Sequence, residues 1–308
     1  MNKNAVTFII IAFNEERTIL NCIDAIHAQD YIGEFSIVVV NDASEDQTLS
    51  ILKKLIIKNK NISISSNKNN SGRGFSRNRG LSLSTSEFVA YIDADIVIPR
   101  NWLSRCMLEI KDCDCVGGIA VPDGDVQFVF NLFKLTPKIK KHTVSVTGSN
   151  GLFRKRVLEK TSFLNQMKNG EDVDLSWRLE KQGVRIKSLP DLICLHRETK
   201  TFYQSIAWLF QSGIGASGLF KIHQRVRLPD VVSYLFFAIL LLSISYSIVF
   251  GQLIVLLLPA LFALLVSALH LSSKFFLKLS SNTIGAILTN SILMTAYFLG
   301  RLVGMATK

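Results

Sequence analysis

The most constraining feature of this sequence is a stretch of 43 residues, Val231 to Ser273, that contains no Asp, Glu, Lys or Arg. An α-helix needs about 20 predominantly apolar residues to cross the hydrocarbon core of a bilayer. The stretch is therefore long enough for two crossings, which we expect over residues 231–250 and 252–270. A turn at Gly251 and Gln252 separates them in this interpretation.

A second uncharged run, from Leu279 to Gly300, predicts a third and more polar candidate span. We therefore assign residues 230–308 to a membrane anchor of two to three transmembrane helices. Lys274 and Lys278 follow the second span and basic residues precede the first, whereas the turn between these spans has none. Because cytoplasmic loops are enriched in Lys and Arg, we expect the residues before the anchor to lie in the cytoplasm.

The chain is basic, with a net charge of +11. A positive net charge favours binding to nucleic acid, to an anionic membrane surface or to an anionic substrate. The apolar tail favours the membrane, and neither an aromatic-interleaved basic patch nor zinc-finger spacing supports nucleic acid. We therefore expect the bilayer and a phosphate-bearing substrate as partners, and no nucleic acid. The five cysteines lack paired metal-ligand spacing, and we interpret them as reduced thiols in the core.

The first two thirds of the chain predict an α/β domain. Residues 6–13 and 35–41 are short, continuous apolar runs, which is typical of strands buried on both faces of a sheet. Helical segments separate the strands, and this alternation predicts a Rossmann-like, mostly parallel sheet over residues 1–198. Further strands are expected over residues 61–66, 87–92, 115–121, 144–147 and 184–188.

Residues 15–29 and 45–59 have helical spacing. Ser44 stands where an N-cap of the second helix is expected, with Gln47 at the capping-box position.

Residues 199–229 have aromatic and aliphatic side chains at helical spacing and end in a basic cluster, Lys221 to Arg227. This pattern favours an interfacial amphipathic helix with a basic collar. An ordinary helix that closes the α/β domain is the alternative.

Polar residues that can carry chemistry follow the predicted strands, where parallel sheets bind their ligands. Asp42 and Ser44 come directly after the second strand. A carboxylate there can accept a hydrogen bond from a nucleobase or a ribose, although a turn and a helix cap use the same residue types. Asp93 and Asp95 follow another strand, and two carboxylates at this spacing can bind one Mg²⁺ or Mn²⁺. Such a cation makes a diphosphate a better leaving group.

Two further charged clusters lie on predicted helices. Arg73 and Arg77 are four residues apart near the start of one helix, so they share a face that suits phosphate oxygens or, alternatively, solvent. Glu171 and Asp172 lie in the first turn of another helix, where the helix dipole stabilises acids. An acid in this place can also serve as a general base beside a sugar hydroxyl.

In this order and spacing, the clusters resemble the family 2 glycosyltransferases, which have the GT-A fold. The resemblance implies a GT-A catalytic domain, a nucleotide-sugar donor and a divalent cation. The matching segments are Asn14-Glu15-Glu16, Asp42-Ala43-Ser44, Gly74-Phe75-Ser76-Arg77-Asn78, Asp93-Ala94-Asp95, Thr147-Gly148-Ser149-Asn150 and Gly170-Glu171-Asp172.

The resemblance also implies donor-binding roles. Glu15 and Asp42 contact the nucleobase, and Arg77 lies near the diphosphate. The three residues after Thr147 shape the floor beneath the donor sugar and the acceptor. The implied nucleotide-sugar-binding residues are Phe13, Glu15, Asp42, Ser44, Arg77, Asp93, Gly148, Ser149 and Asn150.

The metal and the catalytic base follow from the same resemblance. Asp95 is implied as the direct metal ligand, and Asp93 as a residue that faces the ribose and the metal shell. His196 is either a further metal contact or a plain hydrogen-bonding residue. Asp172 resembles the base that deprotonates the acceptor, which implies inversion of configuration. Glu171 supports the helix start or a metal-bound water.

The sequence departs from the family at one position. Membrane polysaccharide synthases of this family carry Q-x-x-R-W after the base, whereas this chain has Gln204-Ser-Ile-Ala207-Trp208. The missing guanidinium and the short anchor favour transfer of a single sugar over processive polymer synthesis.

We therefore predict inverting transfer from a nucleotide-sugar, in particular a UDP-sugar, to a hydroxyl of a lipid-linked or membrane-associated acceptor in cell-envelope glycan biosynthesis. Two alternatives stay open: a polyprenyl-phosphate glycosyltransferase, and a non-catalytic nucleotide-sugar-binding protein.

Overall fold

The structure is a computed structural model that describes residues 5–122, 136–137, 148–167, 169–197, 201–276 and 280–307. It separates into two compact units. The first comprises residues 1–123 and 140–198, and the second comprises residues 124–139 and 199–308.

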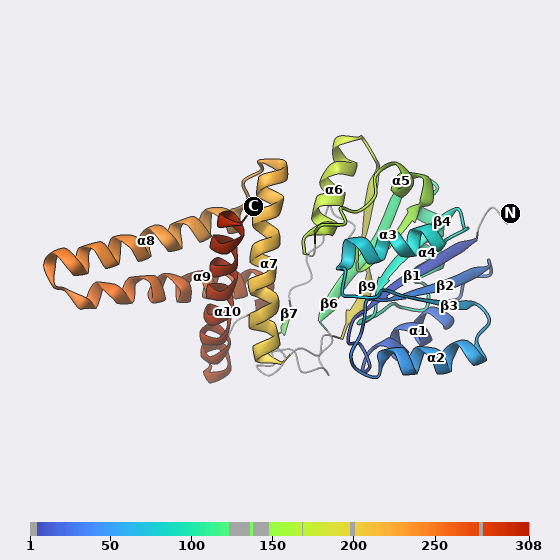
Figure 1. Ribbon diagram of the computed structural model, residues 1–308, viewed down its shortest axis with the longest axis horizontal. Helices are drawn as coiled ribbons and strands as arrows, with labels where there is room; N and C mark the ends of the chain where they lie inside the picture. Colours follow the sequence, from blue (N-terminus) through green and yellow to red (C-terminus); the bar gives the residue numbers. More distant parts are fainter. Residues whose placement is uncertain are drawn as a thin grey trace. The chain divides into compact units, whose positions relative to one another are not determined.

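The first unit is an α/β domain with helices packed against a sheet (Figure 1). The sheet has eight strands in the order β3-β2-β1-β4-β8-β6-β9-β5. The strands are β1 (Val6–Ala12), β2 (Phe35–Asn41), β3 (Ile62–Ser66), β4 (Phe88–Asp93), β5 (Ile96–Val97), β6 (Cys115–Pro122), β8 (Asn150–Arg154) and β9 (Ile186–His196). The helices are α1 (Ile19–His27), α2 (Thr48–Lys58), α3 (Arg73–Leu83), α4 (Trp102–Glu109), α5 (Lys155–Lys160) and α6 (Glu171–Lys181).

Alternate residues of the central strands face opposite layers, because side chains alternate across a strand. Phe8 and Ile10 of β1 belong to a core shared with α1, α2 and α4. Ile9 belongs to a second core shared with α3, α5 and α6. Burial on both faces explains why β1 and β2 are continuous apolar runs, and it confirms the predicted α/β class.

The sheet is mixed. Strands β3, β2, β1 and β4 are mutually parallel, as predicted. Strand β8 runs antiparallel to both of its neighbours, β4 and β6. The expected strand over residues 144–147 lies outside the described residues.

Several predicted boundaries were wrong for local reasons. The N-cap of α2 is Gln47 rather than Ser44, and the helix start is held by Asp46, whose Oδ1 accepts from the Thr48 backbone N–H at 2.9 Å. Helix α1 begins at Ile19, four residues later than expected, because Asn14 adopts a left-handed backbone with φ +59° and a turn follows it.

Strand β9 was predicted to end at Ser188, yet it continues to His196. Its register with β6 shifts between Gly117 and Ile119, opposite the segment that contains Pro190. Proline usually interrupts a strand because it lacks a backbone donor, but this one lies in the irregular part of the pairing. The strand therefore carries His196 to its end.

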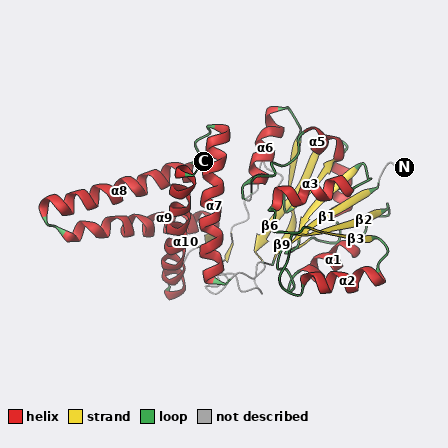
Figure 2. Cartoon of the chain, viewed as in Figure 1, coloured by secondary structure: helices red, strands yellow, loops and turns green. Residues whose placement is uncertain are grey.

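The described part of the second unit consists mainly of long helices (Figure 2). They are α7 (Phe202–His223), α8 (Leu228–Phe250), α9 (Leu258–Lys274) and α10 (Ser281–Ala306). A short antiparallel pair of β7 (Thr136–Pro137) and β10 (Phe275–Phe276) completes the described part. Gly251 ends α8 with φ +68° at the predicted turn, and a 3₁₀ turn over Leu253–Leu257 leads into α9. By length and composition, Leu228–Phe250, Leu253–Ser273 and Ser281–Ala306 can each cross a membrane.

Helices α7 and α10 approach each other unusually closely. A Cβ added to Gly213 of α7 would lie 2.2 Å from the Tyr297 carbonyl oxygen, and one on Gly300 would lie 1.9 Å from that of Phe210. The Ser217 hydroxyl also donates to the Arg301 carbonyl at 2.8 Å. Small residues permit such contact in helix pairs. Most of the buried residues of α7 are therefore small: Ser205, Gly213, Ala216 and Ser217, beside Leu219.

Candidate functional site

The loops after β1 and β2 are joined by hydrogen bonds between their backbones and side chains. The backbone N–H of Asn14 donates to the Ser44 hydroxyl at 3.0 Å, and that of Glu45 donates to the Asn14 side-chain oxygen at 2.8 Å. Asn14 and Ala43 both adopt left-handed backbones, with φ +59° and +61°. Such a conformation costs about 1–2 kcal/mol for a residue with a Cβ. Strain of this kind is concentrated at the ends of two neighbouring parallel strands, where ligands bind in α/β sheets.

Four of the residues implied in nucleotide-sugar binding, Phe13, Glu15, Asp42 and Ser44, come from these two strand ends and their loops. The Phe13 side chain is 42% exposed at the end of β1. The Glu15 carboxylate accepts from the Thr18 hydroxyl at 2.6 Å. Ser44 accepts from Asn14, so its predicted role as a helix cap is replaced by a role between the loops. An exposed ring beside polar groups is the arrangement that a stacked base requires.

Asp42 is buried and holds the loop that precedes α3. Its carboxylate accepts from the Asn67 side-chain amide at 2.7 Å, and from the backbone N–H groups of Ser71 and Gly72 at 2.9 Å. A carboxylate has about four acceptor positions, so these contacts leave room for one further bond. Asn67 was not predicted from the sequence, because a buried Asn in a polar loop has no distinctive pattern.

Arg77, in the first turn and a half of α3, joins two acids from different elements. Its Nη2 lies 2.9 Å from Asp93 Oδ1 at the end of β4, and its Nη1 lies 2.5 Å from Glu171 Oε1 in the first turn of α6. Arg77 and Glu171 are each only 1% exposed. The guanidinium also lies over the ring of Phe163, 5.2 Å from its centroid. The alternative of a solvated basic face is therefore wrong for Arg77.

The acids of this cluster stabilise the positive charge of Arg77. Burial alone would lower the pKa of the Arg77 guanidinium, but the charges of Asp93, Glu171 and Asp172 outweigh burial and raise it above its ordinary value. Within the described residues, Glu171 Oε2 and Arg77 Nε have no hydrogen-bond partner. A buried polar atom without a hydrogen bond lowers the free energy of unfolding by about 1–3 kcal/mol. The presence of two such atoms suggests that the cluster does more than stabilise the fold.

Asp95 and His196 form a second pair. Asp95 Oδ2 lies 3.0 Å from His196 Nε2, because Ile96 of β5 pairs with His196 at the end of β9. Burial raises the pKa of the nearby Cys22 thiol, and the charges of Asp95, Asp93 and Glu15 raise it further. Asp95, Asp93 and Glu15 therefore all lie near enough to Cys22 to influence its thiol.

The Asp95 and His196 pair fits a divalent cation. A carboxylate oxygen and an imidazole nitrogen are ligands that Mn²⁺ accepts. The described residues contain no group of three or more His, Cys, Asp or Glu side chains that could hold a metal. A cation here would therefore complete its shell with water or phosphate oxygens, as Mg²⁺ commonly does.

The predicted floor lies beside Asp93. The backbone N–H of Asp93 donates to the Ser149 carbonyl at 3.0 Å, and Asn150 begins β8 opposite Ile92. Gly148 packs directly on the Arg77 guanidinium, since an added Cβ would lie 2.7 Å from Cζ. Thr147, the first residue of this predicted segment, lies outside the described residues.

Asp172 differs from the other two acids in the first turn of α6. Glu171 and Asp174 are buried and form salt bridges with Arg77 and Arg178. Asp172 is half-buried, its Oδ1 accepts from the Val173 backbone N–H at 2.8 Å, and no salt bridge to it occurs among the described residues. Its carboxylate therefore has capacity to accept a proton or a hydrogen bond.

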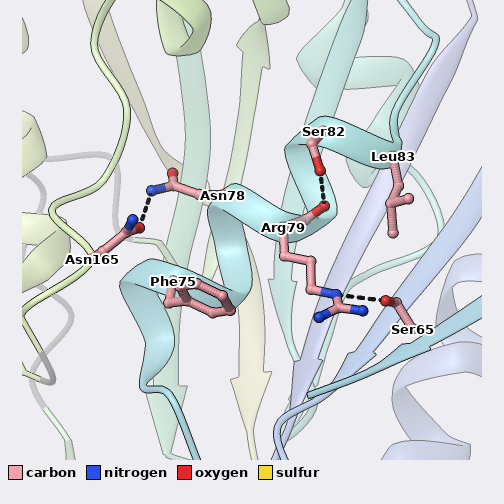
Figure 3. Close-up of a pocket in the computed structure, with 7 residues that line it drawn as sticks. All are labelled: Ser65, Phe75, Asn78, Arg79, Ser82, Leu83 and Asn165. Atoms are coloured by element: carbon pink, nitrogen blue, oxygen red, sulfur yellow. Dashed lines mark hydrogen bonds between the residues drawn. The ribbon is translucent and has the colours of Figure 1, made fainter. Parts of the chain in front are cut away.

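A separate pocket is lined mostly by side chains of α3 (Figure 3). Arg79 donates from Nε to the Ser65 hydroxyl at 2.7 Å, and its Nη1 donates to Asn67, which contacts Asp42. The pocket is lined by Ser65, Phe75, Asn78, Arg79, Ser82, Leu83 and Asn165, none of which is a predicted site residue.

The sequence profile of the Glycosyl transferase family 2 matches residues 7–162, slightly more than half of the chain. The chain belongs to this family. The matched region contains the strand-end loops, Arg77, the two acids after β4 and the Gly148 segment.

Relatives with the same enzyme class cover much of the chain. The glycosyltransferase YaiP of Escherichia coli is 25% identical over 240 residues, which are 73% of this chain and 60% of YaiP. The glycosyltransferase AglE of Haloferax volcanii is 27% identical over 221 residues, 68% of this chain and 72% of AglE. A poly-beta-1,6-N-acetyl-D-glucosamine synthase of Staphylococcus aureus is 22% identical over 203 residues, 61% of this chain and 49% of the synthase. The chain thus spans between about half and three quarters of these relatives.

Solved structures confirm the GT-A fold. The mannosyltransferase PcManGT of Pyrobaculum calidifontis superposes with a TM-score of 0.63 at 19% identity, covering 96% of this chain and 86% of that one. Residues 1–349 of TarS from S. aureus superpose with a TM-score of 0.52 at 20% identity, covering 95% and 91%.

Proposed function

We propose that this protein transfers one sugar, with inversion, from a nucleotide-sugar to a hydroxyl of a lipid-linked or membrane-associated acceptor in cell-envelope glycan biosynthesis. One observation carries the proposal. Asp172 is half-buried and without a salt bridge in the described part of α6, while its neighbour Glu171 is tied through Arg77 to Asp93. A carboxylate in that setting is suited to act as a general base.

Donor binding uses the strand ends. The nucleobase lies against Phe13, Glu15, Asp42 and Ser44, which the two joined loops bring together. PcManGT was solved with GDP-Man and Mn²⁺, and TarS with UDP-GlcNAc, which supports a nucleotide-sugar donor here. We favour a UDP-sugar.

Asp95 and His196, with Asp93 close by, would hold a divalent cation such as Mn²⁺ or Mg²⁺. When bound, this cation neutralises the charge that develops on the departing diphosphate. Gly148, Ser149 and Asn150 lie at the end of β4 beside Asp93 and form the floor for the donor sugar.

Asp172 takes the proton of the acceptor hydroxyl as its oxygen attacks the anomeric carbon. The carbon–oxygen bond to the acceptor forms while the bond to the diphosphate breaks, and the electron pair leaves with the nucleoside diphosphate. Attack from the side opposite the leaving group inverts the configuration. A positioned base of this kind contributes about 10²–10⁴-fold to the rate.

Substitution of Asp172, the proposed general base, tests the proposed sugar transfer. Radiolabelled transfer from a panel of nucleotide-sugars into extracted membrane lipids is compared for the wild-type protein, Asp172→Asn and the control Asp191→Asn, whose carboxylate is exposed and pairs with Arg105 away from the site. We expect Asp172→Asn to keep its donor affinity and lose about 10²–10⁴-fold in turnover. Asp191→Asn should behave as wild type.

The other outcomes identify the alternatives. Near-normal turnover of Asp172→Asn points to a lipid phosphate acceptor, because a phosphate is already ionised and needs no base. Donor binding without transfer to any acceptor points to a non-catalytic binding protein. A product with retained configuration contradicts the single-displacement step.

For the anchor, we propose that α8 and α9 cross the membrane and that α10 does not. Residues 1–198 and the interfacial segment 199–229 then lie on the cytoplasmic side. Lys221, which precedes the first span, donates to the carbonyl oxygens of Gly304, at 2.8 Å, and Thr307. Arg301 of α10 forms a buried salt bridge of 2.7 Å with Asp230 at the start of α8. The end of α10 is thereby held on the side where α8 begins.

The start of α10 supports the same topology. It follows α9 after a short connection, and α9 returns from the turn at Gly251 to the side of entry. Both ends of α10 then lie on the side of the membrane where α8 begins. Tyr203 and Trp208, which are 80% and 37% exposed on α7, are typical of a helix at the membrane interface.

A further inference from the structure

Arg77 links α3 to four other segments of the first unit. It forms salt bridges with Asp93 at the end of β4 and with Glu171 in α6. Its guanidinium lies over the ring of Phe163 and beside Gly148. Arg77 therefore connects the end of β4 to the start of α6.

The geometry differs from that of a phosphate ligand. An arginine that binds a diphosphate presents its N–H donors to solvent before the ligand arrives. Arg77 is 1% exposed, and each of its two terminal nitrogens already donates to a carboxylate. The positive charge of Arg77 is therefore compensated by two acids of the protein itself, Asp93 and Glu171.

The start of α6 needs a contact such as the salt bridge between Glu171 and Arg77. The N-cap of this helix is Gly170, with φ +81°, so no side chain caps the first turn. Glu171 is the residue of that turn that reaches Arg77, and Asp172 follows it directly. The direction in which the Asp172 carboxylate points therefore depends on how Glu171 is held.

We propose that Arg77 is a positioning residue: by bridging Asp93 and Glu171, it sets the first turn of α6, and with it Asp172, relative to the donor-binding end of β4. The proposal rests on the proposed function, in which Asp172 is the base. Lysine is a poor substitute, because an ammonium group is a single point charge and lacks the planar fork that reaches two carboxylates.

The test compares two arginines that each pair with a buried acid of α6. Arg77→Lys is measured beside Arg178→Lys, since Arg178 forms an i,i+4 salt bridge with Asp174 in the same helix but makes no contact with Asp93. We expect Arg77→Lys to lose about 10²-fold in turnover at saturating donor, because misplacement by about 1 Å can cost this much. Nucleotide affinity measured by calorimetry should change less than about threefold, and Arg178→Lys should keep its turnover.

Amide hydrogen exchange supplies a readout that does not depend on catalysis. In Arg77→Lys, the amides of Val173 and Asp174, which donate to Asp172 Oδ1 and to the Gly170 carbonyl, should exchange at least about tenfold faster, whereas those of β1 and β2 stay protected. Glu171→Gln keeps the size of the side chain and should show the same local change. It also serves as the test if Arg77→Lys does not fold.

Two results would overturn the proposal. One is wild-type exchange of the Val173 and Asp174 amides in both variants. The other is a nucleotide affinity at least about tenfold weaker in Arg77→Lys with turnover retained at saturating donor, which would make Arg77 a diphosphate ligand. If the wild-type protein transfers no sugar from any donor, the proposed function fails, and the exchange data still decide whether Arg77 sets the start of α6.

Discussion

Substitution of Gly148 by alanine gives a sharp test of the geometry around Arg77. The added Cβ would lie 2.7 Å from Arg77 Cζ and 2.9 Å from both terminal nitrogens. Carbon atoms in favourable contact are about 3.5–4.0 Å apart, so one partner must move by roughly 0.8 Å. Arg77 is buried, bonded to two carboxylates and packed on Phe163, so it cannot move without breaking a salt bridge or disturbing this packing.

The expected effects follow from this displacement. Overpacking of a well-packed site costs about 1–3 kcal/mol, which should lower the melting temperature by several degrees. A shift of Asp172 that follows the guanidinium should reduce turnover about 10²-fold. Thermal unfolding and turnover at saturating donor measure the two effects separately.

The same substitution at Gly218 in α7 is the control, because a Cβ there has nothing within 4 Å. Alanine is favoured over glycine in a helix by about 1 kcal/mol, so Gly218→Ala should be neutral or stabilising. If Gly148→Ala retains the melting temperature and the turnover of the wild type, the close contact between Gly148 and Arg77 is not a constraint on the site and the reasoning fails.

Three further predictions concern the metal pair, the strained loop and the membrane topology. Asp95→Asn should weaken nucleotide binding at least about tenfold in Mn²⁺ but not in EDTA, and His196→Ala should weaken it less. If both variants bind nucleotide in Mn²⁺ as tightly as the wild type does, the assignment of Asp95 and His196 to the metal is contradicted. Ala43→Gly should raise the free energy of unfolding by about 0.5–1 kcal/mol, since glycine adopts φ +61° without strain, and an unchanged or lower value in urea unfolding would refute this. In intact membranes, a maleimide reagent should label Gly251→Cys and Thr307→Cys from opposite sides; labelling of both from one side would exclude the two-span topology. The native thiols should not interfere, because all five are buried and burial raises their pKa, that of Cys194 to about 12.

Much of the fold was predictable because local pattern and tertiary environment agree. The apolar runs of β1 and β2 are buried on both faces, and the helices α3 and α6 begin at or within one residue of the expected positions. The uncharged tail likewise forms three helices long enough to cross a membrane. In each case the side chains of one segment carry the signal, and no distant partner alters it.

The site was predictable only in part. Asp93, Arg77, Gly148 and Glu171 were singled out as separate motifs, but their assembly into one buried cluster depends on partners 16 to 94 residues apart in sequence. The role of Ser44 was missed because Asn14 competes for its hydroxyl across the gap between two loops. His196 reaches Asp95 through a strand that continues past Pro190, which local rules treat as a breaker.

The sequence by itself determined the class of the domain, its family motifs and the position of the long apolar helices, because hydrophobic periodicity and motif spacing are properties of single segments. The tertiary structure decided which charges are compensated and which remain available. Arg77, expected to face a ligand, forms salt bridges with two acids inside the protein. Asp172 remains without a salt bridge within the described residues. It also decided that α7 packs on α10 through glycines, since a close approach of two backbones depends on both helices and cannot be inferred from either one.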